Sequence, residues 1–233
     1  MNKKIFSQEA LKIIACVTML LDHIGAVLVP SMANYKVYYA LRIIGRISFP
    51  IFCFLLAEGV AHTKNPVKYG LRLLIGVFLA ELPFDLALSG RVDWAYQSVM
   101  VTLFLGFGMS LIMNKLDRTK LVPVIIFGFL AELFRCDYGI WGIAMIGLFV
   151  MTRERKDRNN LQIIGMLIIC YFMNSATVGI FGIRVPIQLF AVLALIPIFL
   201  YTGQKSTGSK VIQTIFYLFY PVHLLVLYII KIM

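Results

Sequence analysis

Charged residues are scarce in this sequence of 233 residues. They make up 14% of the chain, and Asp and Glu together number only 11. Hydrophobic residues make up 61% of it. A soluble domain of this size does not combine so few charges with so much apolar sequence, so the composition excludes a soluble protein. It predicts a polytopic membrane protein instead.

Metal-binding and disulfide patterns are also missing. The four cysteines, Cys16, Cys53, Cys136 and Cys170, show no CxxC spacing and mostly lie inside apolar runs. They are expected to be small core residues, not a disulfide framework or a zinc site. The three histidines lie far from one another, and no compact ligand spacing joins them to carboxylates, so no metal is expected.

Repeats, low-complexity tracts and a soluble domain are absent as well, which favours one integral membrane domain over residues 1–233. The net charge of +11 would suit nucleic acid, but the basic residues are distributed as in a membrane topology. Membrane lipids are therefore the expected surroundings, and no nucleic-acid partner is expected. The first apolar run mimics a signal peptide, but it is long enough to span, contains Asp22 and His23 and lacks a small-x-small cleavage site. It is expected to be retained.

Apolar runs long enough to cross a bilayer predict an all-α, polytopic transmembrane helical bundle of about nine spans, within a range of 8 to 10. The runs cover approximately 10–29, 38–61, 69–88, 97–114, 121–135, 138–152, 161–177, 185–201 and 211–230. The fifth and sixth are short and are joined at 135–137. They are expected to form either a pair of short helices or one re-entrant unit.

Basic residues predict the orientation of these spans. With the N-terminus inside, 15 of the 22 Lys and Arg residues fall in inner segments, within 3–12, 64–72, 115–120, 153–158 and 205–210. The outer segments hold five, and two more lie within the membrane. Cytoplasmic loops carry such an excess of Lys and Arg, so the N-terminus is expected to be cytoplasmic and the C-terminus outside.

Several charged or polar residues lie inside the predicted spans, where each central charge costs about 2.5–3.5 kcal/mol if it faces lipid. One group lies in the middle or outer half of the membrane: Asp22, His23, Arg42, Arg46, Glu81, Asp85 and His223. A second group lies near the inner surface: Glu58, His62 and Arg72. The first group is expected to face the bundle interior as one cluster. It would either hold three helices together through ion pairs or form a charged vestibule for a polar substrate, and the two roles are compatible.

Lys12 and His23 are expected to share one face of the first helix. They are eleven residues apart, and eleven steps of about 100° return to within roughly 20° of the same direction. The two side chains would lie about 16 Å apart along the helix, which suits a long ligand with an anionic head and a reactive tip. His23 has the ordinary pKa range for proton transfer near neutral pH, although an interhelical hydrogen bond would also explain it. Asp22 lies about 100° away and is expected to pair with an arginine, which leaves His23 facing the cavity.

Four stretches resemble the TraX family: LKIIACVTMLLDHIG, LRIIGRISFPIFCFLLAEGVAHTKNPVKYGLRLL, AELPFDLAL and FYLFYPVHLL. The best-known members of this family N-acetylate the pilin subunit of conjugative pili. The similarity extends over nearly the whole chain and is strongest in residues 11–88 and 216–225. Lys12 and His23 also resemble the basic-x10-His element of the wider membrane acyltransferase superfamily. The resemblance implies that His23 is catalytic, that Lys12 contributes to acyl-CoA handling, and that the protein lies in the bacterial cytoplasmic membrane.

Together these observations predict an enzyme that transfers acetyl, or another short acyl group, from cytosolic acetyl-CoA to an amine or hydroxyl of an extracytoplasmic acceptor. That acceptor would be a protein N-terminus, such as that of pilin, or a glycan. Three sets of side chains are expected to do this: His23 and Asp22 at the reacting centre; Lys12, Lys64, Lys68, Arg72, His62 and Glu58 around the acyl-CoA; and Arg42, Arg46, Glu81, Asp85 and His223 around the acceptor and the oxyanion.

Two other classes of function remain open from the sequence. An ion- or proton-coupled transporter would use the buried cluster as a relay, although the internal repeats and paired broken helices of transporters are not evident. A purely structural membrane scaffold would not explain the Lys12–His23 register. The acceptor, the acyl length, the oligomeric state and the choice between direct transfer and an acyl-histidine intermediate are likewise open.

Overall fold

The computed structural model of the chain describes residues 4–29, 34–116, 119–173, 175–180, 182–204 and 210–233. Parts of the basic segments, namely residue 3, residues 117–118 and residues 205–209, therefore lie outside the described residues. The elements in chain order are α1 (Gln8–Leu28), α2 (Tyr35–Gly45), α3 (Ser48–His62), α4 (Pro66–Ser89), α5 (Val99–Met113), α6 (Leu121–Leu133), α7 (Gly139–Thr152), α8 (Arg158–Phe172), β1 (Thr177–Ile180), β2 (Ile183–Pro186), the 3-10 helix η1 (Ile187–Ala194), α9 (Leu195–Phe199) and α10 (Lys210–Ile232).

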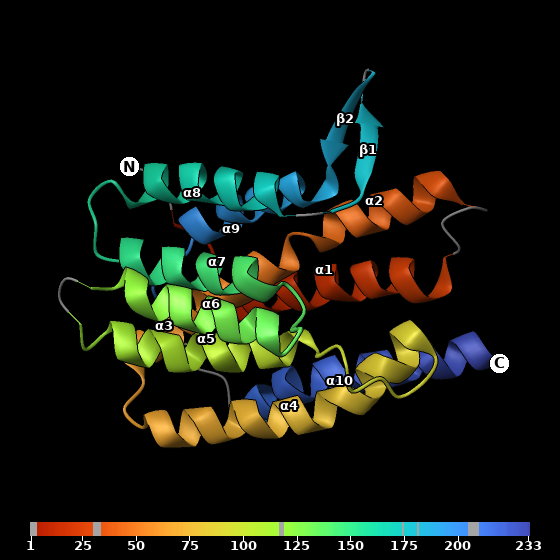
Figure 1. Ribbon diagram of the computed structural model, residues 1–233, viewed down its shortest axis with the longest axis horizontal. Helices are drawn as coiled ribbons and strands as arrows, with labels where there is room; N and C mark the ends of the chain where they lie inside the picture. Colours follow the sequence, from red (N-terminus) through yellow and green to blue (C-terminus); the bar gives the residue numbers. More distant parts are fainter. Residues whose placement is uncertain (1–3, 30–33, 117–118, 174, 181, 205–209) are drawn as a thin grey trace.

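Most helices run roughly along the long axis of the molecule (Figure 1). Helices α4 and α10 lie side by side along one edge, and α1 packs against α2, α3 and α10. Helices α5, α6 and α7 pack together, and α8 lies beyond α7. Helices α1 and α10 run in the same direction, because Lys12 of α1 contacts Phe216 while His23, further along α1, contacts His223. The first helix, α1, and the last helix, α10, thus pack together as a parallel pair.

Three helical stretches are long and apolar enough to cross a membrane: Gln8–Leu28, Tyr35–His62 and Gln213–Ile232. Shorter apolar helices accompany them at Val99–Met113, Leu121–Leu133, Gly139–Thr152 and Ile187–Phe199. Large apolar side chains such as Phe78, Ile125 and Phe129 point outward and are exposed. Outward-facing apolar side chains on apolar helices are the surface that a bilayer covers, so the chain has the architecture of a helical membrane protein.

The second predicted span, 38–61, is divided into two helices. Helix α2 ends at Gly45 and α3 begins at Ser48, with residues 46–47 forming a turn. Pro50 explains the break, because its ring nitrogen carries no hydrogen for the carbonyl group of Arg46, four residues earlier. The turn places Arg46 at a bend between the two helices.

The region after α8 departs from the expected all-α fold. Strands β1 and β2 form a small antiparallel hairpin in which Thr177 pairs with Pro186 and Ile180 with Ile183. The hairpin projects from the helices (Figure 1). Its β-branched residues favour an extended conformation, and Gly182 has a φ of +81° at the turn. The span expected at 185–201 is correspondingly the end of β2 followed by η1 and α9.

The fifth and sixth runs form two separate short helices, α6 and α7, which pack against each other. The turn between them contains two non-glycine residues with positive φ, Arg135 at +51° and Tyr138 at +65°. Gln97 fixes this turn, because its backbone N–H donates to the carbonyl oxygen of Arg135 and its own carbonyl oxygen accepts from the N–H of Asp137. The turn thereby brings Asp137 and Tyr138 to the interior.

All four cysteines, Cys16, Cys53, Cys136 and Cys170, are buried and free. The expectation that they are core residues is therefore confirmed.

Candidate functional site

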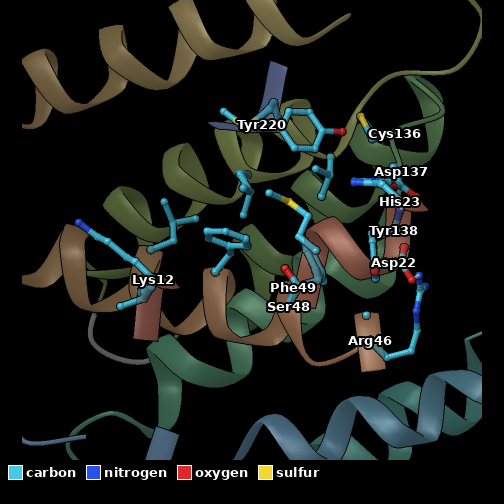
Figure 2. A pocket seen from close by; sticks show the side chains of 18 of the residues that line it. Lys12, Asp22, His23, Arg46, Ser48, Phe49, Cys136, Asp137, Tyr138 and Tyr220 are labelled. Atoms are coloured by element: carbon cyan, nitrogen blue, oxygen red, sulfur yellow. Dashed lines mark hydrogen bonds and ion pairs between the residues drawn. The ribbon is translucent and has the colours of Figure 1, made fainter. Parts of the chain in front are cut away.

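One cavity of about 950 Å³ extends through the bundle and is lined by α1, α3, α4, α5 and α10, by α2 and by the turn before α7. Lys12 lies at one end, which we call the Lys12 end, and Asp22, His23 and Arg46 lie toward the other, the His23 end (Figure 2). Ser48 lies between the two. The eleven-residue spacing therefore has the predicted consequence: both Lys12 and His23 line the same cavity.

An ion-pair network holds the His23 end together. Asp22 accepts a hydrogen bond from Nη1 of Arg42 at 2.6 Å and one from Nη2 of Arg46 at 2.5 Å. Nη1 of Arg46 reaches Oε1 of Gln188 at 3.4 Å, and its Nε donates to the carbonyl oxygen of Arg42. All three charged side chains are largely buried. The pairing of Asp22 with arginine predicted from the sequence is present, and one carboxylate neutralises part of two cationic charges.

Gly45 allows this network to form. A Cβ atom at position 45 would lie 2.2 Å from Cβ of Asp22, closer than any real contact. The backbone of α2 therefore approaches α1 directly beside Asp22. No larger residue fits at this position without moving one of the two helices.

His23 is hydrogen-bonded to the last helix. Its Nδ1 lies 2.8 Å from Nε2 of His223, and Nδ1 of His223 lies 2.7 Å from the carbonyl oxygen of Phe219. His223 is 6% exposed and does not line the cavity, so it lies behind His23. His223 was expected around the acceptor and the oxyanion, and in the structure its ring contacts His23 instead of lining the cavity.

Four polar atoms of cavity-lining residues are buried and have no hydrogen-bond partner within the described part of the chain. They are the hydroxyl groups of Tyr220 and Ser175, Nε of Arg42 and Nε2 of Gln188. Buried polar groups are nearly always hydrogen-bonded in folded proteins, so orphaned ones need an explanation. All four can donate, and a ligand with oxygen acceptors would satisfy them.

At the Lys12 end, cations lie against aromatic rings. Nζ of Lys12 is 5.3 Å from the centre of the Phe216 ring. The guanidinium of Arg72 lies 5.6 Å from the ring of Tyr69 and 5.8 Å from that of Tyr217. All five residues line the cavity, so this end combines two positive charges with flat apolar faces.

The other residues expected around an acyl-CoA divide into two groups. Glu58 and His62 line the cavity, where Glu58 pairs with Nε of Arg153 at 3.1 Å and lies 3.8 Å from Nδ1 of His62. Lys64 and Lys68 are exposed and do not line it. Lys64 lies in the turn before α4, and Lys68 lies in the first turn of α4. Both are therefore too far outside to be lining residues of the cavity.

Glu81 and Asp85 do not join the arginines, which corrects the expectation of a single outer cluster. Glu81 accepts hydrogen bonds from the backbone N–H and the hydroxyl group of Ser98, and Asp85 accepts one from the N–H of Asp93 at 2.8 Å. Neither carboxylate lines the cavity. Their physical role is to bind the backbone of the segment between α4 and α5, including the N-terminus of α5, where a negative charge is favourable.

Sequence reasoning missed Asp137 as a member of the cavity wall. It is carried by the turn between α6 and α7, and its Oδ1 accepts from the hydroxyl group of Tyr96 and from the N–H of Tyr138, both at 3.0 Å. Burial raises the pKa of the Asp137 carboxyl above its ordinary value. The Arg-Cys-Asp triplet at 135–137 was the available signal, but it indicated only a junction between two short helices or within one re-entrant unit.

Tyr138, Gln188 and Tyr220 were missed as well. Tyr138 stacks on Phe49 at 3.8 Å between ring centres, and all of these residues line the cavity. Aromatic residues near a helix end most often belong to packing or to the membrane interface, and a lone glutamine has no pattern. Only the tertiary fold identifies them.

Comparison with known proteins shows which sequences the chain resembles. The family model described as TraX protein matches residues 7–231. The chain is 31% identical, over 238 residues, to the probable fimbrial assembly protein FimC, serogroup H1, of Dichelobacter nodosus, with 95% of this chain and 94% of that protein covered. No solved structure gives a significant match. With its family model matched over nearly its whole length, the chain belongs to the TraX family.

Proposed function

We propose that this protein is a membrane-embedded acyltransferase that moves acetyl from cytosolic acetyl-CoA to an amine or hydroxyl group of an acceptor outside the cytoplasmic membrane of a bacterium. The observation that carries this proposal is that Lys12 and His23 line the same cavity, with Lys12 at one end and His23 toward the other. The cavity offers the ammonium group of Lys12 to a phosphate group and the imidazole of His23 for proton transfer. The distance between them suits the flexible pantetheine arm of acetyl-CoA. The similarity to a probable fimbrial assembly protein favours a pilin N-terminus as the acceptor, with a glycan as the second choice.

The proposed topology has about nine spans with the N-terminus in the cytoplasm. The three long apolar stretches and the four shorter apolar helices give seven candidate spans, and helices α4 and α8 bring the number to nine. The bias of basic residues supports the orientation. In this topology the Lys12 end faces the cytosol, where acetyl-CoA is found. The His23 end faces the outer side, where the acceptor arrives.

In the proposed complex, Lys12 and Arg72 bind the phosphate groups of acetyl-CoA at the cytosolic end. Lys64 and Lys68 lie outside the cavity and contribute to its positive potential, which attracts an anionic ligand. The pantetheine arm follows the face of α1 between Lys12 and His23, with Glu58 and His62 beside it. The thioester then lies near His23, away from bulk water.

The chemical step is an acyl transfer in which His23 is the general base. His23 takes a proton from the acceptor amine or hydroxyl as its nitrogen or oxygen bonds to the thioester carbonyl carbon. The tetrahedral intermediate then loses the C–S bond, and the CoA thiolate leaves with the proton from His23 as free thiol. The products are the acetylated acceptor and CoA, and His23 returns to its neutral form. Transient acyl transfer to His23 is the other form of the same chemistry.

We assign acceptor binding to three donors of the cavity wall. Nε of Arg42, Nε2 of Gln188 and the hydroxyl group of Ser175 have no partner within the described part of the chain. The first carbonyl oxygens of a peptide N-terminus, or the oxygens of a sugar, would accept from them. Asp22 keeps the two arginines in place for this role.

Tyr220 is the best placed donor for the oxyanion, because both arginines are already bound to Asp22. Its hydroxyl group points into the cavity on the side of Cys136 (Figure 2). We expect Tyr220→Phe to lower kcat about 10²-fold, the effect of removing one oxyanion donor. Because that hydroxyl has no protein partner, its loss should leave the thermal unfolding temperature unchanged or raise it. Steady-state kinetics and a thermal melt of the same preparation measure both quantities, and a fall in stability with unchanged kcat would assign Tyr220 a structural role instead.

The decisive measurement is acetyl-CoA binding to the purified protein by calorimetry, with wild type and Lys12→Ala compared. A charge-assisted contact contributes about 1.5–3 kcal/mol, so we expect Lys12→Ala to raise Kd about tenfold or more. Lys4→Ala is the matched control, because Lys4 is an exposed lysine just before α1 that does not line the cavity. An equal change in both variants would mean that only the general positive potential matters.

A thiol-release assay with a synthetic pilin N-terminal peptide completes the test. Release of CoA that depends on the peptide supports transfer. If the folded wild type neither binds acetyl-CoA nor releases thiol, the acyltransferase proposal fails. Solute movement in reconstituted vesicles would then favour the transporter.

A further inference from the structure

The contact between His23 and His223 determines which nitrogen of each ring carries a hydrogen. The carbonyl oxygen of Phe219 can only accept, so Nδ1 of His223, at 2.7 Å, must donate to it. In a neutral His223 the other nitrogen, Nε2, is then a lone-pair acceptor. Nδ1 of His23, 2.8 Å from that lone pair, must therefore carry its own hydrogen and donate it.

The contact also determines which ring nitrogen of His23 is free to accept a proton in the cavity. A neutral imidazole carries one hydrogen, and the contact with His223 holds it on Nδ1. The lone pair of His23 is left on Nε2, the nitrogen that does not face α10. We propose that His223 is a positioning residue that fixes His23 in the Nδ1–H tautomer and so presents Nε2 as the base. Its role in catalysis rests on the proposed acyl transfer, whereas the tautomer itself does not.

No other described side chain can do this for His23. Asp22 is adjacent in sequence, but its two oxygens are bound to Arg42 and Arg46, and it projects about 100° away around the helix. The Tyr220 ring is an edge-on neighbour at 6.0 Å between centroids, which packs against the imidazole without a hydrogen bond. His223 is the group within hydrogen-bonding distance of the His23 ring.

His223 is itself held rigidly, as a positioning residue must be. Its ring stacks on Phe219 at 5.0 Å with an interplanar angle of 19°, and it is 6% exposed. It projects from α10, which packs directly on α1. The orientation of the base on the first helix is thus set by the last helix.

The contact also serves the reaction after the proton has moved. When Nε2 of His23 takes the acceptor proton, the ring carries a positive charge and Nδ1–H becomes a stronger donor. Nε2 of His223 then accepts a charge-assisted hydrogen bond, which is stronger than a neutral one. This hydrogen bond stabilises the positive charge in the interior, and the proton remains on His23 for the departing thiolate.

Nitrogen-15 NMR of the protein labelled in its histidine rings tests the tautomer directly, since protonated and unprotonated ring nitrogens resonate far apart. The chain contains three histidines, and comparison with His62→Asn removes the third set of signals. We expect His23 in the wild type to show a protonated Nδ1 and an unprotonated Nε2. In His223→Leu, which cannot accept a hydrogen bond, we expect a shift toward the Nε2–H form. A wild-type His23 protonated on Nε2 alone would overturn the proposal, whatever the enzyme does.

Kinetics of three variants of α10 test the role in catalysis. We expect His223→Leu to lower kcat about 10²-fold with little change in KM for acetyl-CoA, because the donor binds at the other end of the cavity. His223→Gln should recover a large part of kcat, since its amide oxygen can accept from Nδ1–H of His23. Val222→Ala is the matched control, because Val222 is 52% exposed beside His223. A kcat for His223→Leu equal to that of the wild type, or a Gln variant no better than the Leu variant, would show that His223 only packs.

The two measurements separate the possible failures. If no preparation releases thiol, the proposed function fails, and the NMR experiment still decides the tautomer. If thiol release occurs and the tautomer is wrong, the acyl transfer stands and the role of His223 is rejected.

Discussion

Replacement of His23 by glutamine is expected to lower the rate of thiol release about 10²- to 10⁴-fold, the range that a general base contributes. Glutamine is a neutral side chain whose amide can still donate to Nε2 of His223. It therefore keeps the contact between α1 and α10 and removes only the proton acceptor. Acetyl-CoA affinity should be unchanged, because Lys12 and Arg72 lie at the other end of the cavity. Single-turnover thiol release and calorimetry on the same preparation measure the two effects.

The control for this variant is Val17→Ala, which shortens an exposed apolar side chain on the same helix. It should release thiol at the wild-type rate. Turnover by His23→Gln equal to that of Val17→Ala, in protein with an unchanged thermal melt, would remove His23 from the chemistry. The cavity would then be a binding site without an assigned base.

The second large effect is on stability. Asp22→Asn keeps the shape of the side chain but leaves the guanidinium groups of Arg42 and Arg46 buried without their counter-charge. Removing one partner of a buried ion pair costs about 3–5 kcal/mol, because the remaining charge is uncompensated. We expect the free energy of unfolding to fall by this amount. Unfolding in mixed detergent micelles, followed by circular dichroism, measures it.

Two further variants show whether unpaired charge is the cause. The double variant Asp22→Asn, Arg46→Met removes one of the two unpaired cations and should regain part of the lost stability. Asp157→Asn removes an exposed carboxylate that pairs with Arg155 on the surface, and it should unfold like the wild type. A double variant less stable than Asp22→Asn would mean that the arginine contributes packing and not an uncompensated charge.

Much of the site could be predicted from periodicity and charge. The spacing of Lys12 and His23 predicted that both lie on one face of α1, and both line the cavity. The free-energy cost of a charge in a bilayer predicted that Asp22 pairs with an arginine, and it does. These predictions succeed because a helix has a fixed geometry and because an unpaired charge has few stable positions in an apolar surrounding. The family resemblance drawn from four polar stretches is likewise confirmed.

The predictions that failed concern contacts that leave no periodic pattern in the sequence. Glu81 and Asp85 were placed with the arginines, but the segment after α4 folds back and offers backbone N–H groups of Ser98 and Asp93. Backbone donors are present at every position, so sequence gives no signal for them. The partnership of His23 with His223 joins positions 200 apart, and no local pattern predicts which two helices are neighbours.

The adjacency of Asp22 and His23 has a consequence for how α1 can change. Asp22, which anchors the helix through its ion pairs, and His23, which faces the cavity, are consecutive residues about 100° apart around the helix. Inserting or deleting one residue after the anchor would turn His23 by that angle and move it about 1.5 Å along the axis. Inserting or deleting one residue between Lys12 and Asp22 would turn Lys12 away from the cavity instead. Helix α1 therefore fixes the distance between the two ends of the cavity, and we expect insertions and deletions to be tolerated only in the connections outside it.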